Sequence, residues 1–234
     1  MRAVVTLLFI ASASLALGVF VIPSNRTSAD EPKLRPADSD SPLAKDWPDA
    51  TKPGVIEVKQ YPGYRSAVAK AKDVSMGADN ILFFSLFNHI SRSQIEMTTP
   101  VVNTYTPTMI ETPNSTGEVS MEFVYRTPNM GKTGRGVGAV EVVDHPAQLY
   151  VCLGLQGVMN NDRMREGVTQ LKTWLEEHKA EYVSDGSPRR LGYHGPMTPA
   201  RERRWEVQLP IKRTGATEPS AAKPTDAPKT PVQP

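Results

Sequence analysis

The 234-residue sequence predicts an α+β domain in which two helices pack on antiparallel strands that curl into a barrel-like body. Three observations predict this fold. Short stretches of alternating polar and apolar residues recur between residues 54 and 213, two longer stretches have helical periodicity, and the order of these elements repeats. Val140-Glu141-Val142 repeats Ile56-Glu57-Val58 after 84 residues. We therefore infer a duplicated β-α-β-β unit.

The first unit begins with strands at 54–58 and 64–71, on either side of a break at Tyr61-Pro62-Gly63. A helix follows, and Asp79 or Asn80 can cap its first turn. Further strands are predicted around 94–105 and 118–125. The apolar residues of the helix fall at helical spacing and give it a broad apolar face: Leu82, Phe83, Leu86, Phe87 and Ile90.

The second unit repeats this order. Strands at 140–142 and 149–155 precede a helix over about 162–178, and two more strands follow near 190–193 and 204–211. Met197-Thr198-Pro199 also echoes Met97-Thr98-Thr99-Pro100. The agreement between these short matches and the order of elements supports the duplication.

Both flanks of the domain have the composition of linkers. Eleven of the 21 prolines fall within 23–53 and 214–234, which we expect to be a disordered linker and a disordered proline-rich tail. The folded domain is therefore expected over 54–213, and residues 50–213 are expected to keep the full thermal stability.

Residues 3–22 follow Arg2 and carry no charge, as in an export signal. The segment is also long enough to span a bilayer. Residues 1–22 are therefore either a signal peptide, cleaved after Thr27-Ser28-Ala29, or an N-terminal membrane anchor. Both alternatives place the domain outside the cytoplasm, in the periplasm or secreted, with contact to the membrane only through this segment.

Composition and motifs exclude several function classes. The formal net charge of +2 argues against a nucleic-acid-binding protein, and the single Cys152, which we expect to be an inert buried thiol, allows neither an internal disulfide nor a cysteine-based metal site. Gly134-Arg135-Gly136 precedes a strand, so it lacks the helix N-terminus that a phosphate needs. The sequence has no nucleophile elbow, no histidine pair at the helical spacing of a metal site, and no two carboxylates that sequence alone would bring together, so nothing in it requires an enzyme.

One resemblance covers the whole domain, about residues 53–211. The helix end Leu86-Phe87-Asn88-His89-Ile90, followed by Ile95-Glu96-Met97-Thr98-Thr99-Pro100-Val101, resembles the SOUL haem-binding protein family. The resemblance continues in Met121-Glu122-Phe123-Val124-Tyr125 and ends in Arg203-Arg204-Trp205-Glu206-Val207. It implies a distorted antiparallel β-barrel with two helices and a pseudo-twofold repeat, a fold that is similar to multidrug effector-binding domains.

The resemblance also implies that haem or a related tetrapyrrole binds in an apolar groove along the first helix. Its pocket would comprise Leu82, Phe83, Leu86, Phe87, His89, Ile90, Met97 and Met197. Arg92 and either Arg201 or Arg203 would pair with the propionates. Gln60 and Thr198 depart from the family pattern, since some members have an iron-ligating histidine and a basic residue at these positions.

Each candidate residue also has a structural reading. His89 and His194 are the candidate axial ligands, although His89 also suits a helix C-terminus. Met97 and the phenylalanines also suit a core, and Phe84 lies off the main apolar face, where it would mark an exposed patch. The arginines near 189–204 alternate with Glu202 and Glu206, which indicates a solvated face.

Two functions follow from these expectations. The first is non-enzymatic binding of haem or another hydrophobic small molecule by an exported carrier or buffer. The alternative is a tethered protein-interaction module with a vestigial haem pocket and a protein partner.

Overall fold

The computed structural model describes residues 41–77 and 79–215. The predicted signal peptide or anchor, the linker up to residue 40 and nearly all of the proline-rich tail lie outside the described residues. Within the described ranges, no helix is both long enough and apolar enough to cross a membrane.

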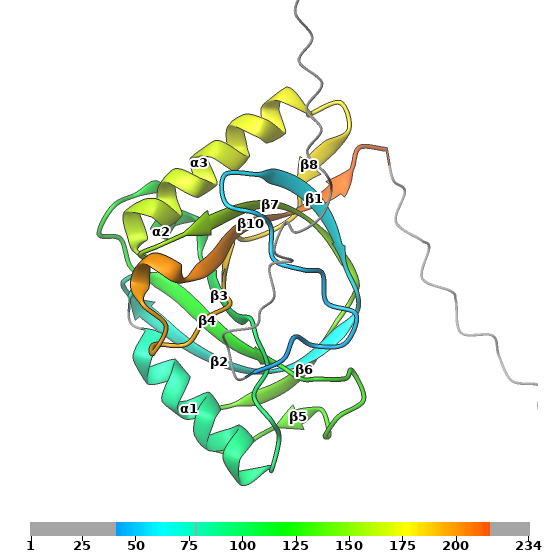
Figure 1. Cartoon of the computed structure of the whole chain (residues 1–234), viewed down its shortest axis with the longest axis vertical. Helices are drawn as coiled ribbons and strands as arrows, with labels where there is room; N and C mark the ends of the chain where they lie inside the picture. The colour runs from blue at the N-terminus through cyan, green and yellow to red at the C-terminus, as the bar shows by residue number, and fades with distance from the viewer. Residues whose placement is uncertain (1–40, 78, 216–234) are drawn as a thin grey trace, which may run out of the picture. The chain divides into compact units, whose positions relative to one another are not determined.

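The described residues form one antiparallel sheet, with helices on one of its faces (Figure 1). Its strands run in the order β1-β7-β10-β9-β3-β4-β2-β6-β5, and β8 pairs with β10. The strands are β1 (Ile56–Tyr61), β2 (Tyr64–Val74), β3 (Val101–Tyr105), β4 (Gly117–Val124), β5 (Gly134–Arg135), β6 (Glu141–His145), β7 (Gln148–Gln156), β8 (Tyr182–Ser184), β9 (Arg189–Gly192) and β10 (Arg204–Arg213).

The strand order confirms the α+β class and the duplication. The strands β1, β2, β3 and β4 of the first unit correspond to β6, β7, β9 and β10 of the second. If every strand is replaced by its counterpart, the order from β1 to β6 is the original order read backwards, with β3 and β9 at the centre. The first strand of each unit pairs with the other unit, β1 with β7 and β6 with β2. The strands on either side of Tyr61-Pro62-Gly63 are therefore not partners. The predicted barrel is incomplete, because the edge strands β1 and β5 pair with one neighbour each and the sheet does not close.

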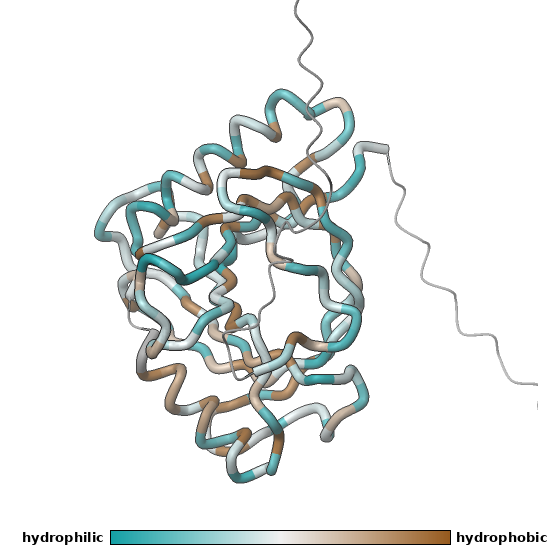
Figure 2. The backbone as a smooth tube through the Cα atoms, in the orientation of Figure 1, coloured by the Kyte–Doolittle hydropathy of each residue, from teal (hydrophilic) through white to brown (hydrophobic). Residues whose placement is uncertain are grey.

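Helix α1 (Asp79–Arg92) packs on β2 and β4, and helix α3 (Asn161–Glu177) packs on β7 and β10. Asn160 caps α3, because its side chain accepts a hydrogen bond from the Arg163 backbone N–H at 2.9 Å. The structure adds a short helix that the sequence analysis did not predict, α2 (Pro107–Glu111), which Pro107 begins. Figure 2 shows that α1 is more hydrophobic along its length than α3.

The two faces of the sheet are both buried, but they differ in chemistry. The helix-covered face carries aliphatic and aromatic residues such as Val151, Leu153 and Val207. The opposite face, which we call the inner face, carries the residues that alternate with them, among them Tyr150, Cys152 and the polar Glu206 and Gln208.

Residues 41–53, which we call the strap, cover the inner face. The sequence analysis assigned them to a disordered linker, but the structure packs Ala44, Trp47 and Thr51 against the sheet. Figure 1 shows the strap in dark blue across the open centre of the curved sheet. The difference arises because Trp47 and Ala44 bury their side chains in a face that only the folded sheet creates. The prolines and charged residues that suggested a linker lie at other positions of the strap, none of which is buried.

Candidate functional site

The residues predicted to form the haem groove separate onto two sides of α1. Leu82, Leu86 and Ile90 are buried against the sheet and belong to the core. Phe83 is half-buried and meets Phe123 of β4 edge-to-face, with ring centroids 5.2 Å apart. The helical spacing of Leu82, Leu86 and Ile90 thus reflects packing against the sheet, because these residues form the buried side of an amphipathic helix.

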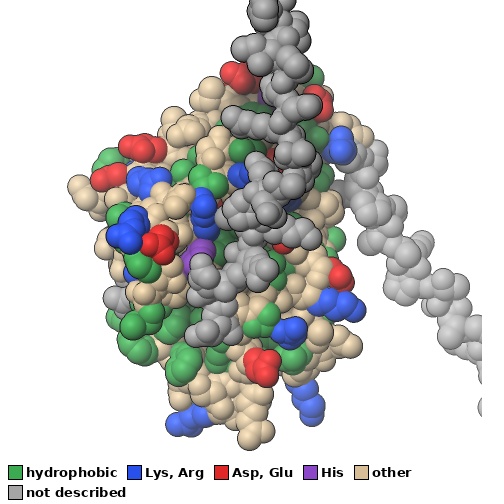
Figure 3. All heavy atoms as spheres, in the orientation of Figure 1, with side chains coloured by type: hydrophobic (Ala, Val, Ile, Leu, Met, Phe, Trp, Pro, Cys, Tyr) green, Lys and Arg blue, Asp and Glu red, His purple; other side chains and the backbone are tan. Residues whose placement is uncertain are grey.

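An apolar row lies on the outer side of the same helix. Ile81 and Phe84 are exposed to 75% and 71%, and Phe87 to 49%. We call these three residues the α1 apolar row. Their spacing of three residues places them on one side of the helix. Figure 3 shows hydrophobic side chains gathered over the region that α1 occupies in Figure 1. The exposure of Phe84 confirms the exposed patch expected from its position off the main apolar face.

A pocket of about 580 Å³ lies at the C-terminal end of α1. We call it the α1-end pocket. Its walls combine apolar, polar and cationic side chains with the backbone of the segment before β6, and the residues that line it are His89, Ser93, Gln94, Ile95, Tyr125, Met130, Gly131, Lys132, Arg135, Gly136, Val137 and Val142. Of the predicted site residues, only His89 lines this pocket. Its volume is within the range of about 300–1,000 Å³ that is typical of small-molecule sites.

His89 and Tyr125 form a hydrogen-bonded pair in the wall of this pocket. The His89 Nδ1 accepts a hydrogen bond from the Val137 backbone N–H at 3.1 Å, so the ring proton belongs on Nε2. The His89 Nε2 then donates to the Tyr125 hydroxyl at 2.8 Å. Burial lowers the pKa of His89 and raises the pKa of Tyr125, so both side chains are neutral at pH 7.

Gly136 is required for this arrangement. A Cβ atom on Gly136 would lie 2.9 Å from the His89 Cε1. The close approach of the backbone at Gly136 and Val137 therefore holds the His89 ring in place, so Gly136 of the segment that resembles a nucleotide motif has a packing role.

The other predicted site residues lie elsewhere. The Arg92 Nε donates to the Asn88 Oδ1 on the same helix at 3.1 Å, and Arg201 pairs with Glu202 at 3.1 Å on the surface. Arg203 donates to the carbonyl oxygens of Thr198 and Pro196, both at 2.8 Å. It therefore braces the loop that carries Met197.

Met197 itself is 94% exposed, whereas Met97 is half-buried and packs against the core. The Nδ1 of His194 accepts a hydrogen bond from the Arg204 backbone N–H at 2.9 Å. The structure thus does not gather the predicted methionines, arginines and histidines into one lining. Among the residues described, no group of three or more His, Cys, Asp or Glu side chains could hold a metal ion.

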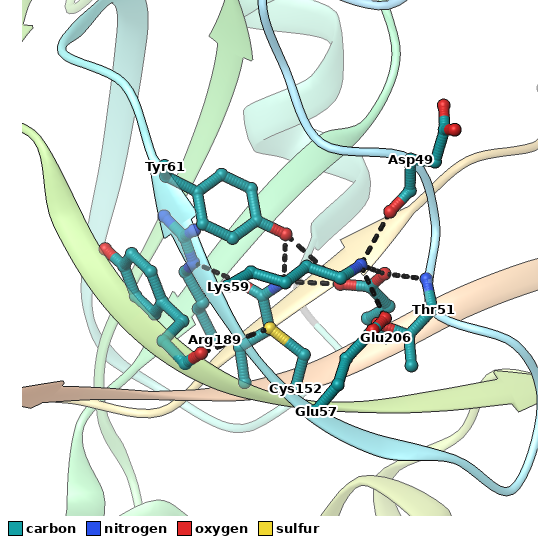
Figure 4. Close-up of polar contacts among 10 residues, drawn as sticks. Asp49, Thr51, Glu57, Lys59, Tyr61, Cys152, Arg189 and Glu206 are labelled. Carbon is teal, nitrogen blue, oxygen red and sulfur yellow. Dashed lines mark hydrogen bonds and ion pairs between the residues drawn. The ribbon is translucent and has the colours of Figure 1, made fainter. Parts of the chain in front are cut away.

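The inner face holds a polar cluster centred on Glu206 of β10, which is fully buried (Figure 4). Its Oε1 accepts hydrogen bonds from the Lys59 ammonium at 2.9 Å and from the Thr51 backbone N–H of the strap. Its Oε2 accepts from the Gln208 amide, and from the Tyr61 hydroxyl at 3.4 Å. These contacts satisfy a carboxylate that would otherwise be costly to bury.

Arg189 lies in the same cluster, where it is buried among tyrosine rings. Its guanidinium carbon lies 3.5 Å from the ring centroid of Tyr150 and 5.0 Å from that of Tyr61, and its Nε donates to the Gln208 Oε1 at 2.8 Å. The sequence analysis placed Arg189 and Glu206 on a solvated face. That expectation is wrong, because the strap covers the polar side of β9 and β10.

A serine, a histidine and a glutamate also meet on the inner face, but without the geometry of a catalytic triad. The Ser66 hydroxyl lies 2.8 Å from the His145 Nε2, and the Glu122 Oε2 approaches the same nitrogen at 3.3 Å. In a triad the carboxylate holds the opposite nitrogen, Nδ1. Ser66 is also fully buried, so this cluster reads as a polar part of the packing.

Sequence reasoning missed both the inner-face cluster and most of the α1-end pocket. The only local signal was the alternation of Glu206 and Gln208 with Trp205, Val207 and Leu209, which is equally typical of a strand with one solvated face. No local pattern brings Tyr125, Met130 and Arg135 to the end of α1.

Solved structures with a similar fold include the crystal structure of the EcmrR C-terminal domain, at 17% identity and a TM-score of 0.56, covering 68% of this chain and 98% of that one. The cryo-EM structure of an EcmrR–DNA complex matches at 17% identity and a TM-score of 0.55, with coverage of 68% and 58%. An uncharacterized conserved protein from Listeria innocua matches at 10% identity and a TM-score of 0.52, with coverage of 68% and 93%. At these identities the similarity concerns the fold alone.

No curated protein matches the sequence. A family model described as SOUL heme-binding protein matches residues 48–210, which span β1 to β10 and nearly the whole described domain. The match includes the helix end and the Met97-Thr98-Thr99-Pro100 segment on which the resemblance rested. This chain therefore belongs to the SOUL heme-binding protein family.

Proposed function

We propose that this chain binds haem or a related tetrapyrrole in the α1-end pocket and catalyses no reaction. The position of the pocket is the observation that carries the proposal. The pocket lies at the end of α1, and the resemblance to the SOUL family implies that the ligand binds along this helix. The volume of about 580 Å³ suits a ligand of this class.

The lining of the pocket supports the same ligand. Ile95, Met130 and Val142 offer apolar contact to a porphyrin face, and methionine adapts well to a flat ligand. Lys132 and Arg135 are exposed cations at the same pocket and would pair with the propionates. They take the part that the sequence analysis gave to Arg92, Arg201 and Arg203.

Iron ligation by His89 requires a rearrangement. Both ring nitrogens of His89 already take part in hydrogen bonds, to Tyr125 and to Val137. We therefore propose that the tetrapyrrole binds through its face and its propionates, without an axial bond from His89.

We further propose that the protein carries or buffers its ligand outside the cytoplasm. The uncharged segment 3–22 after Arg2 supports export, either with cleavage or with retention as an anchor. The near-balance of 27 basic and 25 acidic residues supports a role without nucleic acid.

A haem titration of the Lys132→Ala/Arg135→Ala double variant tests the site. We expect the Kd for haem to rise about 2- to 30-fold, because each of the two exposed ion pairs contributes about 0.2–1 kcal/mol. The matched control is Lys70→Ala/Lys179→Ala, which removes two exposed cations that do not line the pocket. Equal weakening in both variants would indicate a general charge effect and contradict the site.

A protein-binding role is the second candidate, and the α1 apolar row favours it. Ile81, Phe84 and Phe87 do not line the α1-end pocket, so their exposure is not explained by the ligand proposed for it. Replacing all three with serine should leave the haem Kd unchanged if the row serves a protein partner. A weakening of haem binding would instead make the row part of the haem site.

A further inference from the structure

The strap places an indole ring in an aromatic box on the inner face. Trp47 is 5% exposed and meets Tyr61 and Tyr64 edge-to-face, with both pairs of ring centroids 5.0 Å apart. The Trp47 Nε1 is buried and has no hydrogen-bond partner within the described part of the chain. The box therefore packs around an aromatic ring, but it offers no hydrogen-bond acceptor to the Trp47 Nε1.

The strap also supplies two backbone groups to the polar cluster beside the box. The Thr51 N–H donates to the Glu206 carboxylate, and the Asp49 carbonyl accepts from the Lys59 ammonium at 2.6 Å (Figure 4). The Tyr61 ring joins the two parts, because it contacts Trp47 and its hydroxyl donates to Glu206. An aromatic ring and an N–H donor are thus presented together to one site.

Besides the buried side chains of Trp47 and Ala44, backbone hydrogen bonds hold the strap. Lys45 N–H donates to the Arg126 carbonyl at 2.8 Å, and Gly54 N–H donates to the Gly154 carbonyl at 2.8 Å. The strap passes so close to Gly154 of β7 that a Cβ there would lie 2.3 Å from the carbonyl oxygens of Thr51 and Lys52. These backbone contacts lie outside the box, where the strap contributes the ring of Trp47.

We propose that the inner face is a second binding site, for an aromatic molecule with an N–H donor such as an aromatic amine or amide, and that the strap occupies it as an intramolecular ligand. The ring enters the box of Tyr61 and Tyr64, and the donor replaces Thr51 on Glu206. An aromatic carboxylate is disfavoured, since Glu206 and Glu122 are both buried in this face. The site lies on the other side of the sheet from α1, so it is independent of the proposed haem site.

Two variants of the full chain open the site by different means. Trp47→Ala removes the ring, and Gly154→Ala pushes the strap away while every side chain of the site remains. Trp174→Ala is the matched control, because Trp174 stacks on His178 of the α3 end, away from the inner face. Calorimetric titration with tryptamine measures binding, and indole-3-propionate tests the charge preference.

We expect both opened variants to bind tryptamine one-to-one at least about tenfold more tightly than the unmodified chain, since the strap no longer competes. Indole-3-propionate should bind them more weakly than tryptamine. The proposal is overturned if folded opened variants gain no affinity, if Trp174→Ala gains as much, or if the two probes bind equally.

A measurement on the unmodified chain covers the case in which both variants fail to fold. Saturating tryptamine should displace the strap and accelerate tryptic cleavage after Lys45, whereas indole-3-propionate should not. Cleavage at an unchanged rate with tryptamine would count against the site.

Discussion

Glu206 is the residue on which the contacts of the inner face converge. Its donors come from three elements: Thr51 from the strap, Lys59 and Tyr61 from β1, and Gln208 from β10 itself. A buried carboxylate is stable only when such donors surround it, so the strap and β1 are tied to β10 through one side chain. Removal of any one donor would leave the buried Glu206 carboxylate with fewer hydrogen bonds and weaken the whole cluster.

His89 has a comparable position at the end of α1. Its two nitrogens connect the helix to Tyr125, which follows β4, and to the backbone before β6. Both ring nitrogens are therefore engaged by the fold, and neither offers a free lone pair for an axial bond to iron.

We predict that His89→Ala leaves the Soret maximum of the haem complex unchanged. The same variant should lose about 1–3 kcal/mol of unfolding free energy, because the buried Tyr125 hydroxyl loses its donor. Absorbance spectra and urea denaturation measure the two effects, with His178→Ala at the partly exposed end of α3 as the control. A shifted Soret maximum would restore His89 as a ligand.

At the scale of elements, the strap contributes to stability although it contains no regular secondary structure of any length. Trp47 and Ala44 are buried in a cluster with Tyr61, Tyr64 and Leu191. The segment is thus part of the folded unit, which includes residues 41–53 as well as the predicted domain.

We predict that a chain of residues 54–215 melts about 6–20 °C below a chain of residues 41–215. The loss of a buried tryptophan costs about 3–5 kcal/mol, and in a domain of this size 1 kcal/mol shifts the Tm by about 2–4 °C. Differential scanning calorimetry of the two chains measures the shift. Equal melting temperatures would return residues 41–53 to the linker that the sequence suggested.

Helix α1 has two apolar sides with different roles. Leu82, Leu86 and Ile90 hold it on β2 and β4, while Ile81, Phe84 and Phe87 remain exposed. Periodicity finds such a helix reliably, but it does not tell which of two apolar sides meets the sheet.

At the scale of the whole molecule, buried thiol and tyrosine hydroxyl groups determine how stability changes at alkaline pH. Burial raises the pKa of the Cys152 thiol and of the Tyr61, Tyr64 and Tyr193 hydroxyls well above their ordinary values. In the unfolded chain these groups lose their protons near pH 8.5 and pH 10. Above those values the native state binds more protons than the unfolded state, so stability falls as the pH rises.

We predict that the unfolding free energy begins to fall above about pH 8.5, with a slope that approaches 1.4 kcal/mol per pH unit for each group involved. Urea denaturation between pH 7 and pH 11 measures this decline. In Cys152→Ala the decline should start only near pH 10, where the tyrosines begin to titrate. A constant free energy across this range would show that these groups are not protected.

The sequence alone determined the order of the two long helices and of the strands other than β5 and β8, the duplication and the family. These follow from local periodicity, from turn residues and from a motif around α1, all of which act over short distances along the chain. The repeat also predicted the symmetry that the strand order confirms.

Only the tertiary structure decided which surfaces are covered. The alternation of Glu206 and Gln208 with Val207 and Leu209 is the same whether the polar side meets water or a buried cluster. The answer depends on Thr51, 155 residues away from Glu206, and on Lys59, 147 residues away. The burial of a polar side chain requires partners from distant segments, and no pattern within one segment reports whether those partners arrive.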